Sequence, residues 1–110
     1  MPHVRVHGVD KLTLEKVAAE IVSKMAELTD TPSDHFTVEC IASDFLALGG
    51  ASPAYPFFEI LWFDRGQEAK SAIAGFIDEL LRPQIPDGLD ITVVYRDLNG
   101  KDYYENSAHF

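Results

Sequence analysis

The first residues of the chain alternate between apolar and polar positions, a pattern typical of a strand with one buried face. Over residues 3–9 the valines fall on one side, while His3, Arg5 and His7 fall on the other. Gly8 then supplies a residue suited to a turn. The pattern therefore predicts a short strand that begins almost at the first residue.

Two longer segments repeat apolar residues every three or four positions, which is the spacing of an amphipathic helix. The first covers residues 14–28, with Thr13 as a candidate N-cap, and the turn-forming residues 30–33 end it. The second covers residues 69–81, and two prolines within residues 82–86 prevent its continuation. Both segments are predicted helices.

Three further segments are rich in β-branched and aromatic residues, which favour strands. They cover residues 35–48, 57–63 and 89–95. The middle segment is almost continuously apolar, a pattern typical of a strand that is buried on both faces. Near the end of the chain, Asn99-Gly100 is a strong two-residue hairpin signal, so residues 101–104 are predicted as the returning arm.

The order of these elements is strand, helix, strand twice over, which predicts an α/β (α+β) fold in one domain covering residues 1–110. Two βαβ units side by side give a four-stranded sheet with both helices on one face, followed by the C-terminal hairpin. The other face of the sheet is then bare. A chain of 110 residues cannot leave so much apolar surface in water, so we expect this face to pack against another subunit, in an oligomer joined sheet to sheet.

Composition narrows the classes of function. The net charge of -9 and the pI of about 4.6 argue against nucleic acid or an anionic membrane as partner, because phosphate binding needs a positive field. No apolar run approaches the roughly 20 residues of a membrane span. The single cysteine, Cys40, cannot form an internal disulfide, which favours a reducing compartment, and we expect a soluble cytoplasmic protein. Cys40 itself is predicted to be a buried small apolar residue.

Familiar catalytic and metal-binding patterns are missing from the sequence. No CxxC pair, Ser-His-Asp order or phosphate-cradling glycine loop is present. His3 and His7 lie roughly 13 Å apart on an extended strand, too far to share a metal ion. We therefore expect no metal site.

Three stretches of the chain together resemble a known family. Met1-Pro2 runs directly into a strand, a Gly-Gly-Ala-Ser loop lies within residues 48–52, and the tail over residues 103–110 combines aromatic residues with Asn and Ser. With the two βαβ halves, these features resemble the tautomerase superfamily, in particular members of the length of macrophage migration inhibitory factor. The WFDRGQE stretch and the tail are more similar to a bacterial branch of that superfamily with no assigned function.

The resemblance implies a chemistry and a set of residues. Pro2, freed by removal of Met1, would be the catalytic base of a keto–enol tautomerase, because its secondary amine can carry a proton between carbon and oxygen. Arg65, or Arg5 in its place, would bind the carboxylate of a small substrate. The family also implies a homotrimer and needs no metal or organic cofactor. The substrate-binding set expected from the resemblance comprises Arg65, Arg5, Trp62, Asn106 and Tyr104.

Two departures from the family pattern keep other functions open. Thr31 stands before Pro32 where the migration inhibitory factor has a lysine, and Thr92-Val93-Val94 replaces its Tyr-x-Asn. The first alternative is a catalytically degenerate tautomerase fold that binds a small ligand or a protein. The second is an unrelated ferredoxin-like dimer with the same βαβ repeat.

Overall fold

The computed structural model describes residues 1–50 and 53–110 of the chain. Its main elements occur in the predicted order of two strand–helix–strand units and a terminal hairpin. They are β1 (His3–His7), α1 (Lys11–Thr29), β2 (Thr37–Ile41), β3 (Phe57–Trp62), α2 (Gln67–Leu81), β4 (Thr92–Asp97), β5 (Tyr104–Glu105) and β6 (Ala108–His109).

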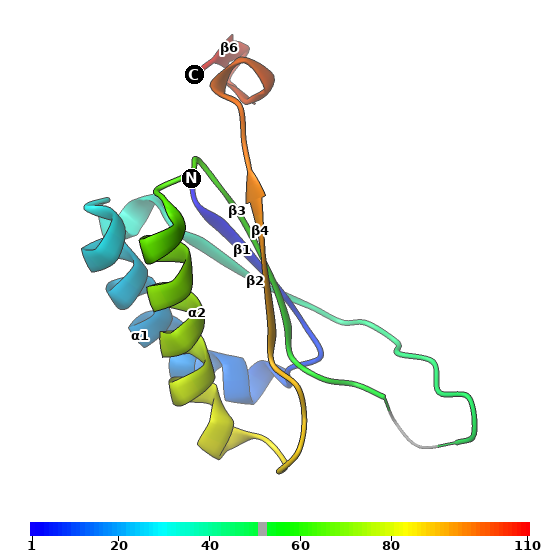
Figure 1. Ribbon diagram of the computed structural model, residues 1–110. Coiled ribbons are helices and arrows are strands. Elements are labelled where there is room, and N and C mark those ends of the chain that lie inside the picture. Colours follow the sequence, from blue (N-terminus) through cyan, green and yellow to red (C-terminus); the bar gives the residue numbers. More distant parts are fainter. Residues whose placement is uncertain (51–52) are drawn as a thin grey trace.

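The four longer strands form one sheet in the order β2-β1-β3-β4. β1 is parallel to β2, β3 is parallel to β4, and the two pairs meet antiparallel between β1 and β3. Each parallel pair is connected through one helix, and both helices cover the same face of the sheet (Figure 1). The predicted pair of βαβ units and the α+β fold class are therefore confirmed.

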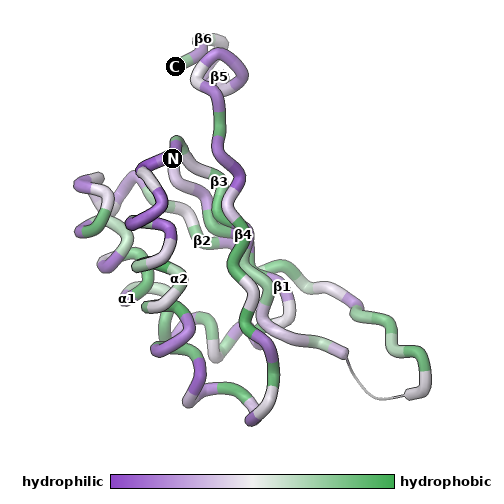
Figure 2. The backbone as a smooth tube through the Cα atoms, viewed as in Figure 1, coloured by the Kyte–Doolittle hydropathy of each residue, from purple (hydrophilic) through white to green (hydrophobic). Residues whose placement is uncertain are grey.

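The hydrophobic core lies between the helices and the covered face of the sheet. Every second residue of β1 and β3 points into it, and Val4, Phe58 and Ile60 have no exposed surface. Figure 2 shows hydrophobic segments of the sheet strands and of both helices in green. The helices contribute residues at helical spacing, including Ile21, Met25, Ile73 and Ile77, each at most 1% exposed.

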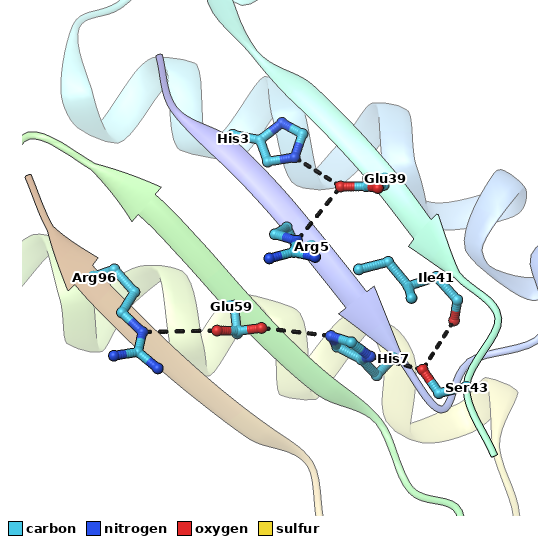
Figure 3. A network of polar contacts seen from close by, with 8 residues as sticks. All are labelled: His3, Arg5, His7, Glu39, Ile41, Ser43, Glu59 and Arg96. Carbon is cyan, nitrogen blue, oxygen red and sulfur yellow. Dashed lines mark hydrogen bonds and ion pairs between the residues drawn. The ribbon is translucent and has the colours of Figure 1, made fainter. Parts of the chain in front are cut away.

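The open face of the sheet carries charged side chains as well as apolar ones such as Phe57 and Leu61, so it is not the uniformly apolar face that was expected. His3 and Arg5 on β1 both contact Glu39 on β2 (Figure 3). Nε2 of His3 is 2.9 Å from Oε1 of Glu39, and Nε of Arg5 is 3.5 Å from the same oxygen. His7 and Arg96 approach Glu59 at 3.4 and 3.7 Å. Opposite charges on neighbouring strands stabilise each other, and strand register decides which residues pair.

Several element boundaries differ from the sequence prediction. α1 begins at Lys11, so Thr13 lies inside the helix and Asp10 is the N-cap. β2 ends at Ile41, because from Ala42 onward the chain leaves the sheet. β4 begins later than predicted and continues to Asp97, since its last residues remain paired with Leu61 and Trp62 of β3.

Residues 42–50 and 53–56 belong to an arm that projects from the body of the protein before β3 (Figure 1). The rings of Phe45 and Tyr55 meet edge to face within the arm, with centroids 5.6 Å apart. Ala51 and Ser52, part of the predicted loop, lie outside the described residues. Cys40 is exposed rather than buried, because β2 is an edge strand; its Sγ is 3.7 Å from the carbonyl oxygen of Val9.

The C-terminal hairpin exists, but its turn is not at Asn99-Gly100. That prediction is wrong: residues Gly100–Asp102 form a short 3-10 helix, and the Asn99 side chain accepts a hydrogen bond from the backbone nitrogen of Lys101. The strands β5 and β6 are instead connected by Asn106 and Ser107, both with positive φ, at 54° and 73°.

Gly100 is needed for a tertiary reason. A Cβ at this position would lie 2.8 Å from the carbonyl oxygen of Phe110, so the tail packs where only glycine leaves room. The Asn-Gly pair therefore serves a close contact between distant parts of the tail, which the local sequence does not reveal.

Candidate functional site

Arg65 follows β3 and reaches across to the end of α1. Its Nη1 donates to the carbonyl oxygen of Thr29 at 3.2 Å, and its Nη2 donates to Oγ1 of Thr31 at 3.5 Å. A helix C-terminus carries unpaired carbonyl groups and a partial negative charge, which attract a cation. The last turn of α1 has no basic residue of its own, so Arg65 supplies that charge.

Arg65 also lines a pocket of about 810 Å³ at the end of the sheet where β1 begins. We call this the N-terminal pocket. Met1 and His3 belong to one wall, Thr31 and Asp34 belong to the segment after α1, and residues of the tail complete it. With Phe63 and Arg65 after β3, the pocket therefore joins four segments that are far apart in the sequence.

Pro2 follows Met1 in the chain and is not itself among the residues that line this pocket. Its ring is buried, and its carbonyl oxygen accepts a hydrogen bond from the backbone nitrogen of Thr37 at 3.2 Å. This bond continues the parallel pairing of β1 with β2 and fixes the position of the residue. The carbonyl carbon of Met1 is bonded to the Pro2 nitrogen, so a pocket lined by Met1 adjoins that nitrogen.

Three aromatic residues form the apolar part of the pocket wall. Phe63 stacks on Phe110 with ring centroids 5.6 Å apart, and Tyr103 meets Phe110 edge to face at 4.7 Å. The backbone nitrogen of Phe110 lies 3.1 Å from the carbonyl oxygens of both Gly100 and Tyr103. The tail thus folds back against the end of β3.

The tail also brings a carboxylate to the pocket. The hydroxyl of Tyr103 is 3.5 Å from Oε2 of Glu105. Burial, and then the negative charge of Glu105, raise the pKa of Tyr103 above its usual range. Tyr103 therefore carries its proton at neutral pH and can donate a hydrogen bond.

The structure brings together only part of the predicted site. Arg65 and Met1 both line the N-terminal pocket, whereas Pro2 does not. Arg5 lies on the open face of the sheet beside Glu39 and does not line this pocket. Trp62 is 1% exposed in the core, where its Nε1 donates to Oδ1 of Asp97, so a substrate-binding role does not fit it.

Tyr104 and Asn106 lie on the exposed hairpin instead of in the N-terminal pocket. Tyr104 is 63% exposed, and Asn106 occupies the turn. Sequence reasoning missed Phe63 and Phe110, which do line the pocket. The available signal was the aromatic character of the last residues, but only the folded tail shows which aromatic ring points inward.

A second pocket, of about 920 Å³, lies between α1 and β2 and contains none of the predicted site residues. Leu14, Val38 and Cys40 contribute to its lining. Among residues 1–50 and 53–110, no cluster of three or more His, Cys, Asp or Glu side chains is arranged to hold a metal ion. No helix within these ranges is long and apolar enough to cross a membrane.

A family model described as "Domain of unknown function (DUF1904)" matches residues 1–109. The chain belongs to this family. A crystal structure of a DUF1904 domain from Sebaldella termitidis is 34% identical, with each chain covered over 100% of its length and a TM-score of 0.91. No curated protein matches the sequence.

More distant solved structures show the tautomerase fold. A macrophage migration inhibitory factor-like protein from Entamoeba histolytica is 16% identical, covers 99% of this chain and 98% of its own, and has a TM-score of 0.76. A fused 4-OT, described as an asymmetric trimer, is 14% identical over 97% of this chain and 94% of its own, also with a TM-score of 0.76. The DUF1904 chain therefore has the fold of migration inhibitory factor and 4-OT, as the sequence resemblance implied.

Proposed function

We propose that this DUF1904 protein is a keto–enol tautomerase that acts on a small carboxylate-bearing substrate, with Pro2 as general base after removal of Met1. One observation supports the proposal: the pocket lined by Met1, whose carbonyl carbon is bonded to the Pro2 nitrogen, is also lined by Arg65. A base and a carboxylate-binding group in one pocket are the two parts that this proton transfer requires.

The chemistry depends on the state of the Pro2 nitrogen. While Met1 is attached, that nitrogen belongs to an amide and has no basicity. An α-amino group ordinarily titrates near 7.7–8.0, and a buried environment disfavours its ammonium form. A freed Pro2 at this buried position therefore supplies free base at neutral pH.

The proposed reaction moves one proton. Arg65 holds the carboxylate of a 2-oxo acid with charge-assisted hydrogen bonds and orients the carbon next to the ketone. The Pro2 nitrogen removes a proton from that carbon, the electron pair forms the carbon–carbon double bond, and the oxygen becomes an enolate. Return of the proton from Pro2 to this oxygen gives the enol and restores the base, with no metal or organic cofactor involved.

The proposal includes a homotrimer in the cytoplasm. The fused 4-OT neighbour is described as a trimer, and its fold is shared over nearly the whole chain. In such an assembly the exposed Tyr104 and Asn106 of one subunit, and Arg5 on the open sheet face, are candidates for contact with a neighbour's pocket.

The test uses 3-bromopyruvate, a 2-oxo acid whose bromide is displaced by a free amine. We expect intact mass spectrometry of the purified protein to show loss of Met1 and one adduct, which peptide mapping places on Pro2. Arg65→Gln should slow the labelling by roughly tenfold to a hundredfold, because a charge-assisted contact with the carboxylate is lost.

Arg82→Gln is the matched control, since Arg82 pairs with Asp78 and does not line the pocket. Its labelling rate should equal that of the unmodified protein. Retention of Met1, or an adduct found only on the exposed Cys40, would refute the proline mechanism.

A second function, ligand binding without catalysis, is favoured by the departures from the family pattern. Thr31 replaces the lysine of the migration inhibitory factor and is engaged by Arg65. Under this function, small 2-oxo acids bind to the processed protein in ligand-observed NMR, but solvent deuterium does not enter their C3 position faster than in buffer.

A further inference from the structure

The N-terminal pocket holds more negative than positive side chains. Arg65 is the only arginine or lysine among the described residues that line it, while Asp34 and Glu105 bring two carboxylates. His3 and His35 also line the pocket, and Nε2 of His3 is 2.9 Å from Oε1 of Glu39. An imidazole, unlike a guanidinium, is not a permanent cation. One permanent cation therefore faces two anions.

Arg65 has limited capacity for ligand, because part of its guanidinium is already committed. Of its five N–H donors, one on Nη1 contacts the carbonyl of Thr29 and one on Nη2 contacts Thr31. The Thr31 hydroxyl in turn donates to the carbonyl of Thr29 at 3.1 Å, and Thr29 is buried. The remaining donors suffice for one bidentate carboxylate and no more.

The rest of the wall suits an uncharged chain. Phe63 and Phe110 offer stacked aromatic surface, and Glu105 beside Tyr103 adds negative charge. An alkyl or aryl group loses water favourably against such rings. A second carboxylate there would be repelled by Asp34 and Glu105 without a free cation to compensate.

We propose that the N-terminal pocket selects 2-oxo acids with a single carboxylate and discriminates against dicarboxylates. This inference rests on the proposed function for the identity of the site, and it adds the substrate class. The second carboxylate of a dicarboxylate would lie several ångströms from Asp34 and Glu105. Near a protein surface, repulsion by these two charges weakens binding of the dicarboxylate by about tenfold.

The test compares two 2-oxo acids with the same five-carbon chain. 2-Oxopentanoate ends in a methyl group and 2-oxoglutarate ends in a second carboxylate, so the pair differs only in the feature at issue. Each is titrated against alkylation of the processed protein by 3-bromopyruvate at pH 8, where free imidazole is neutral. We expect 2-oxopentanoate to halve the alkylation rate at a concentration about tenfold lower than 2-oxoglutarate.

The double variant Asp34→Asn/Glu105→Gln locates the cause of the preference. Both changes preserve size while removing charge, and both residues are exposed, so the fold should be retained. We expect the preference to shrink at least threefold, through tighter 2-oxoglutarate binding and unchanged 2-oxopentanoate binding. Equal or stronger protection by 2-oxoglutarate in the unmodified protein would overturn the proposal.

Failure of the proposed catalysis has a separate signature. If Pro2 is not alkylated, the same two acids are titrated by ligand-observed NMR, which needs no reactive amine. A tenfold preference for 2-oxopentanoate in that measurement supports the charge selection even though tautomerisation fails. Binding of neither acid, or preference for 2-oxoglutarate, overturns it.

Discussion

At the scale of single residues, one side-chain network explains why Trp62 belongs to the core. Its Nε1 donates to Asp97 at 2.8 Å, and the other oxygen of that carboxylate accepts from Nζ of Lys70 at 2.8 Å. Tyr95 packs on the Trp62 ring at 4.9 Å and donates its hydroxyl to the carbonyl of Lys70 at 2.7 Å. Trp62, which the family resemblance assigned to substrate binding, therefore belongs to a network that connects β4 with α2.

The network predicts a pH dependence at Tyr95. Burial raises the pKa of this hydroxyl above its usual value of 10.0, so the folded protein keeps a proton that the unfolded chain loses. Stability must then fall as the pH rises above about 10. Tyr95→Phe should cost about 1 kcal/mol at pH 7 through the lost hydrogen bond. Because phenylalanine does not ionise, we expect urea unfolding to show a smaller gap, or a reversed one, at pH 11.

Tyr104→Phe is the control for this experiment, because Tyr104 is exposed on the hairpin. Its difference from the unmodified protein should be small and the same at both pH values. A gap for Tyr95→Phe that stays constant from pH 7 to pH 11 would mean that burial of the phenol does not disfavour its ionised form.

At the scale of elements, the sequence predicted the helices and strands whose apolar residues form a local pattern. The periods of the apolar residues located β1, α1 and α2, because each buries one regular set of side chains, and an almost continuous apolar run located β3. Features set by a distant partner were missed. The end of β2 depends on where the chain leaves β1, and the turn of the hairpin depends on how Phe110 packs against Gly100.

The candidate site, too, was predicted only in part, because some of its residues are brought together by contacts between distant segments. Pro2 and Arg65 received their roles from the family resemblance; Arg65 and Met1 line one pocket, and Pro2 is buried next to Met1 in the chain. Arg5 lies on the side of β1 that the alternation predicted, but there it contacts Glu39 on the open face and does not line the pocket. The aromatic wall needs the folded tail, which no local pattern in residues 98–110 specifies.

The turn between β1 and α1 yields a prediction about Gly8. This residue has φ of +73°, and a Cβ would lie 1.9 Å from the carbonyl oxygen of Tyr55 in the projecting arm. Gly8→Ala must therefore both strain its own backbone and displace the arm. We expect a loss of at least about 3 kcal/mol in the free energy of unfolding, measured with urea.

Gly88→Ala separates the cost of backbone strain from the cost of the contact with the arm. Gly88 has a similar φ of +83°, but a Cβ there meets no atom within 4 Å. Its substitution should cost only the backbone strain, about 1–2 kcal/mol. Equal losses for the two variants would show that the contact with the arm contributes nothing.

At the scale of the whole molecule, the chain is extended for its length. Its radius of gyration is 14.9 Å, compared with about 13 Å for a compact chain of this size. The arm and the C-terminal hairpin both project from the body, and the arm exposes Leu46 and Leu48 (Figure 1). An isolated subunit leaves these apolar residues in water, which favours the proposed homotrimer.

The charged open face predicts how that trimer responds to mutation. Arg5 and Arg96 balance Glu39 and Glu59 on this face, so three such faces can approach without net repulsion (Figure 3). Arg96→Glu places a second carboxylate beside Glu59 and repeats it in every copy. We expect light scattering to show a trimer for the unmodified protein and a monomer for this variant, because like charges in an interface are strongly unfavourable.

Arg82→Glu is the matched charge reversal, since Arg82 also pairs with one carboxylate, Asp78, but at the end of α2 and away from the open face. It should remain trimeric, with circular dichroism confirming that both variants are folded. A trimer that survives Arg96→Glu would place the interface on another surface, with the projecting arm next in order. A monomeric unmodified protein would leave the N-terminal pocket bounded by one chain alone, so that Tyr104 and Asn106 could take no part in a neighbour's site.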